Sequence, residues 1–123
     1  ERQRVWVAMA LAQKTPILFL DEPTTYLDVY YQFEILELIK KLNREYNITI
    51  VMVLHDMNQA IRYSDWIIVM KNGEIVTEGS PKEVITEGMI ESIYGVRAIV
   101  NHNDQSGFYV VPMGVARRND NET

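Results

Sequence analysis

The residues of this 123-residue chain that could do chemistry gather where two apolar runs end. Asp21 and Glu22 directly follow the apolar run at residues 17–20, and His55 directly follows the apolar run at residues 48–54. Burying an unpaired carboxylate costs several kcal/mol. The sequence therefore predicts a cation, a polarised water or a helix terminus beside the acid pair, unless the first run is not a buried strand at all.

The spacing of these residues fits one kind of reaction. In parallel α/β sheets, ligands bind at the carboxyl ends of the strands. A carboxylate there can hold Mg²⁺ through water, and the next acid can orient and deprotonate an attacking water. A neighbouring histidine can contact a transferred phosphate. Together, Asp21, Glu22 and His55 are typical of one half of a phosphoryl-transfer site.

The apolar pattern predicts the elements that hold these residues. An amphipathic helix is predicted over residues 3–13, from apolar residues that recur at helical spacing. Residues 17–20 and 48–54 are predicted to be strands buried on both faces. Between them we predict a helix over residues 29–45, with Asp28 as its N-cap. Strand, helix and strand in this order predict a parallel βαβ unit with a right-handed crossover.

In the second half of the chain, the sequence predicts shorter elements that are separated by turn residues. Asp56 and Gln59 could cap the first helix of this half reciprocally. Asn-Gly, a strong hairpin signal, and Ser-Pro-Lys-Glu, a capping box with Pro at the first helical position, mark the next two elements. The predicted elements are a helix to about residue 63, a hairpin of residues 66–71 and 74–78, a helix start at residues 80–83, a helix over residues 87–94, and a terminal hairpin of residues 96–100 and 108–113.

Composition argues against several classes of protein. A net charge of −5 and a pI near 5.0 argue against a duplex DNA binder. The absence of cysteine excludes a disulfide framework and thiolate metal sites. No apolar run approaches the ~20 residues of a membrane span, and no signal peptide is visible, so we expect a soluble protein of a reducing compartment. Because the chain begins at Glu1 without an initiator Met, we expect a piece of a longer protein.

The motifs together resemble the C-terminal half of an ABC-transporter ATPase subunit. Residues 17–22 match the Walker B pattern of four apolar residues, Asp and Glu. Residues 25–28 stand where that family has its D-loop, and His55 matches its switch histidine. Residues 1–4 look like the tail of the family's signature motif. The runs DEPTTYLD, VLHDMNQA and KNGEIVTEGSPKEV are similar to importers of ferric siderophores, haem and cobalamin.

This resemblance implies the fold and the roles of the site residues. The implied fold is α/β, a partial P-loop NTPase fold with a parallel sheet core, flanking helices and a C-terminal hairpin. Asp21 would hold Mg²⁺, Glu22 would be the general base for ATP hydrolysis, and His55 would be the second catalytic residue. Glu1, Asp21 and Asp28 would contact the nucleotide, Asp28 from across a dimer interface.

The resemblance also implies domains, partners and a location. Residues 1–95 would belong to the ATPase domain, and residues 96–123 would form an extension with a loose hairpin and a frayed tail. The whole subunit would form a homodimer with ATP between its copies, docked on two transmembrane permease subunits. It would sit peripherally on the cytoplasmic face of the inner membrane and bind no nucleic acid.

Two expectations follow from what the sequence lacks. The chain has no G-x-x-x-x-G-K-[ST] motif, so we expect it to bind MgATP negligibly and not to hydrolyse ATP alone. In the family that it resembles, the strand before that motif lies between the counterparts of residues 48–54 and 66–71. Without that strand these two runs expose edges, and exposed edges recruit other chains. We therefore expect the chain to self-associate.

Other readings remain open on the sequence alone. Asp28 could serve only as an N-cap, and a histidine such as His55 is more often structural than catalytic. A DNA-repair or translation-associated ATPase of the same superfamily is disfavoured by the acidic balance. A non-enzymatic module with this fold is favoured only by the missing phosphate loop. A phospho-acceptor domain using Asp21 would need a further acid cluster and a later lysine.

Overall fold

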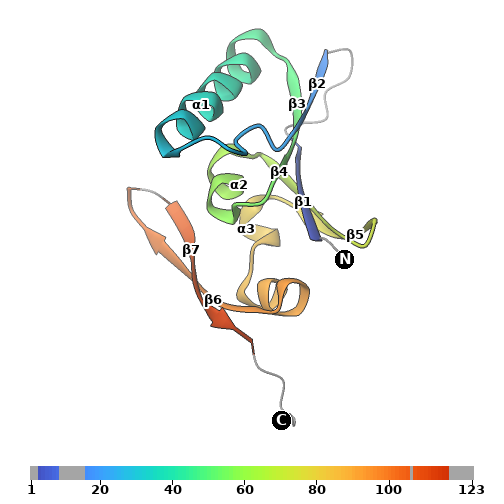
Figure 1. The fold of residues 1–123 in the computed structure, drawn as a ribbon, viewed down its shortest axis with the longest axis vertical. Helices are drawn as coiled ribbons and strands as arrows, with labels where there is room; N and C mark the ends of the chain where they lie inside the picture. Colours follow the sequence, from blue (N-terminus) through green and yellow to red (C-terminus); the bar gives the residue numbers. More distant parts are fainter. Residues whose placement is uncertain (1–2, 9–15, 106, 117–123) are drawn as a thin grey trace.

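The computed structural model of the chain describes residues 3–8, 16–105 and 107–116, as two sheets and a set of flanking helices. Its strands are β1 (Gln3–Ala8), β2 (Ile17–Asp21), β3 (Thr49–Leu54), β4 (Trp66–Lys71), β5 (Glu74–Gly79), β6 (Val96–Asn103) and β7 (Gly107–Val115). Its helices are α1 (Val29–Tyr46), α2 (Met57–Tyr63), α3 (Pro81–Val84), α4 (Glu87–Met89) and the π-helical turn η1 (Ile90–Tyr94). Within the described residues the larger sheet has the order β2-β3-β1-β4-β5, and β6 pairs with β7 (Figure 1).

The βαβ unit that the sequence predicts is confirmed. β2 and β3 pair in parallel, from Ile17 opposite Thr49 to Asp21 opposite Val53, and α1 connects them. Asp28 occupies the N-cap of α1, as predicted, but its side chain makes no capping hydrogen bond. The parallel pairing places the carboxyl ends of β2 and β3 next to each other, at the same end of the sheet.

The prediction that β2 is buried on both faces is wrong. Ile17 is 67% exposed and Phe19 is 52% exposed, whereas most of β3 is buried. In the described part of the chain, β2 has a neighbour only on its β3 side, so it forms an edge of the sheet. An edge strand has fewer groups packed around it, which leaves its apolar side chains accessible.

The N-terminal segment corrects two predictions. Residues 3–8 form the strand β1 and not a helix, and residues 9–13 of the predicted helix lie outside the described residues. β1 lies antiparallel between β3 and β4, with Val5 opposite both Leu54 and Val69 (Figure 1). The expected gap between those strands is therefore filled. Pairing on both sides satisfies the facing backbone groups of β3 and β4, and this outweighs a helical pattern in six residues.

Turn chemistry fixes the second half of the chain as predicted. Asn72 and Gly73, at φ 55° and 79°, form the tight turn between β4 and β5. Ser80 and Glu83 form the reciprocal capping box at the start of α3. The predicted helix over residues 87–94 is α4 followed by η1, and it ends at Gly95, whose φ of 68° suits a C-cap.

The C-terminal hairpin is longer than predicted and packs against α2. The Asn58 side chain accepts a hydrogen bond from the Val110 backbone N–H at 2.7 Å and donates one to the Val110 carbonyl at 3.1 Å. These two bonds tie β7 to α2. The tail that was predicted to be frayed, residues 117–123, lies outside the described residues.

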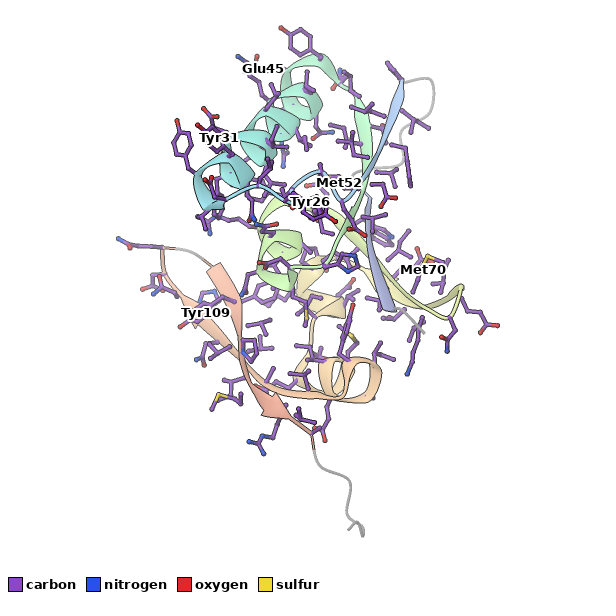
Figure 2. The ribbon with its side chains drawn as sticks, viewed as in Figure 1. Tyr26, Tyr31, Glu45, Met52, Met70 and Tyr109 are labelled. Atoms are coloured by element: carbon purple, nitrogen blue, oxygen red, sulfur yellow. The ribbon has the colours of Figure 1, made fainter. Side chains whose placement is uncertain are left out.

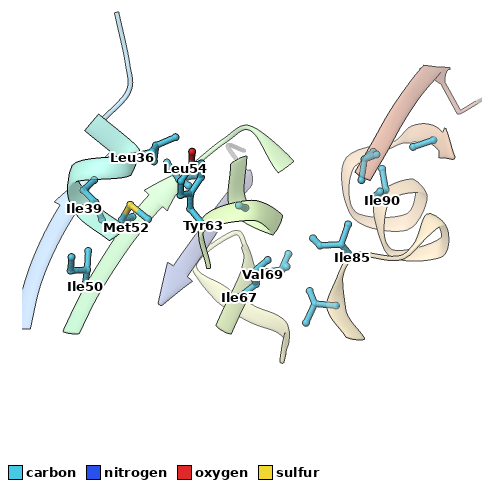
Figure 3. Packing of buried hydrophobic residues seen from close by; sticks show 14 residues of the cluster. Leu36, Ile39, Ile50, Met52, Leu54, Tyr63, Ile67, Val69, Ile85 and Ile90 are labelled. Carbon is cyan, nitrogen blue, oxygen red and sulfur yellow. The ribbon is translucent and has the colours of Figure 1, made fainter. Parts of the chain in front are cut away.

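A single apolar cluster holds these parts together (Figure 3). Its buried members come from α1, β3, α2, β4, α3, η1 and the hairpin: Leu36, Ile39, Ile50, Met52, Leu54, Ala60, Tyr63, Ile67, Val69, Val84, Ile85, Ile90, Ala98 and Val110. Figure 1 shows α1 and α2 on the same side of the strands. The core therefore fixes both helices, and with them the loops at the ends of β2 and β3. Among the described helices, none is long and apolar enough to cross a membrane.

Candidate functional site

The ends of β2 and β3 bring the predicted site residues together. Asp21 is the last residue of β2 and pairs with Val53, two residues before His55. Glu22 continues this pairing, since its backbone N–H donates to the Val53 carbonyl at 2.9 Å. The sheet itself therefore sets the distance between the acid pair and the histidine.

Glu22 and His55 are in direct contact. Nε2 of His55 lies 2.7 Å from Oε2 of Glu22, and the hydroxyl of Thr25 donates to Oε1 of Glu22 at 3.1 Å. A carboxylate can only accept, so Nε2 carries the proton in this contact, whether the ring is neutral or charged. The two side chains remain partly open to solvent, at 32% for Glu22 and 48% for His55.

The loop that carries Glu22 has an unusual backbone. Glu22 and Tyr26 have positive φ angles, 53° and 70°, which for residues with a side chain cost about 1–2 kcal/mol each. Two turn hydrogen bonds hold the loop: Thr25 N–H to the Glu22 carbonyl at 3.2 Å and Leu27 N–H to the Thr24 carbonyl at 3.3 Å. Figure 2 shows Tyr26 on this loop, and its side chain is fully exposed. Such strain is common at functional sites and supports a functional interpretation of the loop.

Asp21 offers one exposed carboxylate at the strand end. In the part of the chain that the structure describes, no group of three or more His, Cys, Asp or Glu residues could hold a metal ion. That donor set does not suit a metal ion held entirely by protein ligands, such as structural zinc. It fits Mg²⁺, which takes one or two carboxylates and fills its other positions with waters and substrate phosphates.

The other predicted site residues lie farther along the chain. Asp28 is exposed at the opposite end of the loop, at the N-cap of α1. Glu1 lies outside the described residues. The structure thus brings together Asp21, Glu22 and His55 at the carboxyl ends of β2 and β3.

Three polar residues at the site were not predicted as functional. Thr25 holds one oxygen of Glu22; the sequence places it in the D-loop position, three residues after that acid, but did not predict this contact. Gln32 donates to the Leu27 carbonyl at 2.8 Å and accepts from Nε2 of Gln59 at 2.8 Å.

The predicted reciprocal capping of α2 is half right. The Asp56 side chain accepts from the Gln59 backbone N–H at 3.1 Å, but the Gln59 side chain donates to Gln32 and not to the backbone of Asp56.

A separate cleft of about 540 Å³ lies between α1, α2 and β7. Its lining includes Phe33, Tyr63 and Tyr109, and not Glu22 or His55. Burial raises the pKa of Tyr63 to about 12, and the hydrogen bond from its hydroxyl to Glu37 at 2.7 Å adds to the shift. The lining also includes the charged residues Glu37, Asp56 and Arg62, whereas the predicted site residues Glu22 and His55 lie outside the cleft at the strand ends.

Relatives of known sequence cover most of this chain. It is 50% identical over 115 residues to the ferric enterobactin transport ATP-binding protein of Escherichia coli (strain K12). The matched region covers 93% of this chain and 42% of that protein. It is 48% identical over 109 residues to the petrobactin import ATP-binding protein FpuC of Bacillus anthracis, covering 89% and 40%. The iron(3+)-hydroxamate import ATP-binding protein of Bacillus subtilis (strain 168) is 50% identical over 98 residues, covering 80% and 36%.

The first of these matches spans 115 of the 123 residues, so it includes the positions of Asp21, Glu22 and His55. The chain belongs to the ATP-binding proteins of ABC transporters. It spans about two fifths of the length of these relatives. The scan against family models returned no match.

The fold agrees with this family. A solved structure described as an inward-facing metal-chelate type ABC transporter superimposes with a TM-score of 0.68, at 20% identity, over 79% of this chain and 40% of that chain. The predicted α/β fold of P-loop NTPase type is therefore confirmed. The predicted parallel sheet core is not, because among the described strands of the larger sheet only β2 and β3 pair in parallel and the other neighbours are antiparallel. At this identity the superposition speaks for the fold alone.

Proposed function

We propose that this chain carries the water-activating half of an ATP-hydrolysing site in the ATPase subunit of an ABC importer. The observation that carries the proposal is the 2.7 Å contact between Glu22 and His55 where β2 and β3 end. The substrate class follows from the relatives, which are named for ferric enterobactin, iron(3+)-hydroxamate and siderophore transport. The whole subunit would power the import of a ferric siderophore.

Glu22 is the proposed general base. Its carboxylate takes the proton of a water whose oxygen attacks the γ-phosphorus of ATP, while the bond to the bridging oxygen breaks and ADP leaves. Thr25 and His55 each occupy one oxygen of this carboxylate, and each oxygen has a second lone pair that can accept from a water. The positive φ of Glu22 and these two contacts fix the base before substrate arrives.

His55 is the proposed partner of both the base and the phosphate. Its Nε2 proton points at Glu22, and one proton cannot serve two acceptors at full strength. A γ-phosphate oxygen near His55 would therefore compete with Glu22 for this donor. The competition would weaken the hydrogen bond from His55 to Glu22 when ATP is present, and so make the Glu22 carboxylate a stronger acceptor for the proton of the attacking water.

Asp21, Asp28 and Glu1 complete the proposal. Asp21 would hold Mg²⁺, which supplies positive charge to the phosphate oxygens when bound. Asp28 and Glu1 would contact nucleotide, Asp28 across the interface of a homodimer. The ATPase subunits would dock on two transmembrane permease subunits at the cytoplasmic face of the inner membrane, with no nucleic acid as partner.

Steady-state ATP hydrolysis by the whole subunit tests this function. Glu22→Gln preserves the shape of the side chain but weakens the base, so turnover should fall by about 10²–10⁴-fold while ATP still binds. Glu74→Gln makes the same change at an exposed residue of β5 and should leave turnover unchanged. Turnover of the Glu22→Gln subunit within about tenfold of wild type would contradict the role of Glu22.

The same assay separates the alternative functions. A DNA-repair or translation-associated ATPase would be stimulated by nucleic acid, whereas an importer subunit would not. A non-enzymatic module would show no hydrolysis in the wild-type subunit.

The 123-residue chain alone is predicted to bind MgATP negligibly, because its sequence has no phosphate-cradling loop. Calorimetric titration of that chain measures this, and binding of micromolar affinity would contradict the prediction.

A further inference from the structure

A continuous line of amide hydrogen bonds joins the loop after β2 to the turn after β3. The side-chain amide of Gln32, in the first turn of α1, donates to the Leu27 carbonyl at 2.8 Å. Nε2 of Gln59, in α2, donates to Oε1 of Gln32 at 2.8 Å. The Gln59 backbone N–H donates to Asp56, the residue after His55, at 3.1 Å.

Only one orientation of the two side-chain amides fits this line. The Leu27 carbonyl can only accept, so Gln32 must present its NH₂ group there. The oxygen of Gln32 then faces Gln59 and needs a donor, which fixes the Gln59 amide as well. Each amide orientation depends on the other, and the carbonyl in the loop determines both.

Burial makes these bonds costly to break. Gln59 is 6% exposed, one of the few polar residues in the buried set. A buried amide that loses its partner keeps the desolvation penalty and gains nothing in return. The line therefore resists any movement of the loop at residues 22–28 relative to α2.

We propose that Gln32 and Gln59 form an amide clamp that positions the Glu22 loop against the His55 turn. Glu22 and His55 are held by their own strands, but their 2.7 Å contact also depends on how the two loops leave those strands. The clamp joins the loops at a second point, on the far side of the Glu22 loop at Leu27. Gln32 and Gln59 are positioning residues, and their catalytic effect rests on the proposed role of Glu22.

Two substitutions break the clamp in different ways. Gln59→Leu removes the donor to Gln32 with a side chain of similar size. Gln32→Glu keeps an oxygen that accepts from Gln59 but can no longer donate to the Leu27 carbonyl. The second substitution lies at a half-buried position and keeps the protein testable if Gln59→Leu impairs folding.

Asn43 offers a matched control on the same helix. Its side-chain amide donates to the Ile48 carbonyl at 2.9 Å, five residues away, as that of Gln32 does to Leu27. It lies near the other end of α1, away from both loops. Asn43→Leu removes the same kind of bond without touching the clamp.

Hydrogen exchange on the whole subunit tests the proposal without ATP. The reporters are the backbone amides of Thr25 and Leu27, which hold the loop turns. In Gln59→Leu and Gln32→Glu these amides should exchange at least tenfold faster than in wild type, and in Asn43→Leu they should not change. Equal exchange in all variants would overturn the clamp.

Kinetics then separate positioning from general destabilisation. In a clamp variant, kcat for ATP hydrolysis should fall about tenfold while KM for ATP stays within twofold. The substitution loosens the loop that carries the base and leaves the residues that bind the nucleotide unchanged. Asn43→Leu should leave both constants unchanged. If the wild-type subunit hydrolyses no ATP, the proposed function fails, but the exchange rates still decide whether the clamp exists. Unchanged kcat in subunits whose loops do exchange faster would overturn the catalytic part of the inference.

Discussion

At the scale of single residues, Glu22 combines backbone strain with two side-chain contacts. A positive φ of 53° is costly for glutamate, and the contacts from His55 and Thr25 hold the residue in that state. Side chains of this kind are ready to act without reorganisation. The structure therefore stores a small cost at the one acid that the proposed chemistry uses as a base.

Tyr63 provides a residue-scale prediction about pH. Its pKa is raised to about 12 from an ordinary value of 10.0, so the folded protein keeps the neutral hydroxyl where the unfolded chain has lost it. The stabilisation is fully present below pH 10 and is lost as the pH rises from 10 to 12. Over that interval the stability of wild type relative to Tyr63→Phe should fall by about 3 kcal/mol, so that the variant becomes the more stable protein at the alkaline end.

Denaturant unfolding of both proteins across the alkaline range measures this difference. Tyr63→Phe also lacks the bond to Glu37, so it should be less stable than wild type by about 1 kcal/mol at neutral pH. A stability difference that stays constant up to pH 12 would show that Tyr63 ionises equally in the folded and unfolded chain.

At the scale of elements, β1 completes the larger sheet. It pairs with β3 on one side and β4 on the other, in antiparallel register along all or most of its length. The sheet core thus mixes one parallel pair, β2 with β3, with antiparallel neighbours. Without β1, the facing edges of β3 and β4 would lack their backbone partners.

Proline substitution tests the role of β1 in the 123-residue chain. Val5 lies opposite Leu54 and Val69, so Val5→Pro removes an N–H from the centre of the sheet and should cost about 3 kcal/mol or more of unfolding free energy. Val76 is the control, because it lies at the irregularity in β5 where Ile75 and Thr77 have strand partners and Val76 has none. Val76→Pro should cost much less. Equal losses in chemical denaturation would contradict a central β1.

The elements also show what the sequence can predict. The path from β2 through α1 to β3 was predictable because apolar runs, helical spacing and an N-cap signal agreed, and so was the meeting of Glu22 and His55 at adjacent strand ends. β1 was not predictable, because its apolar residues recur at helical spacing and only the partners on both sides favour a strand. The clamp of Gln32 and Gln59 was not predictable either, since long-range side-chain bonds leave no periodic signal.

At the scale of the whole molecule, the two edges of the larger sheet differ. At one end β5 carries Glu74 and Glu78 and an irregular register, features that discourage pairing with another chain. At the other end β2 has no charge before Asp21, and Ile17 is 67% exposed. β1 fills the expected gap, so the predicted self-association now depends on the β2 edge.

Light scattering on a size-exclusion column tests this edge in the 123-residue chain. Wild type should elute as a species larger than 14.3 kDa, with a size that grows with concentration. Ile17→Lys should shift it towards the monomer, because a charge on an edge strand opposes pairing. Ile75→Lys makes the same change on β5 and should not shift it. A stable wild-type monomer at every concentration would show that the chain does not associate through the β2 edge.

A double-mutant cycle on Glu22 and His55 tests the central claim most directly. In the whole subunit, turnover of ATP is measured for wild type, Glu22→Gln, His55→Ala and the double variant. Since the two side chains touch at 2.7 Å and are proposed to act as a unit, the double variant should be no slower than Glu22→Gln by more than about threefold. Losses that simply multiply, or a single variant that turns over like wild type, would contradict a site in which Glu22 and His55 work together.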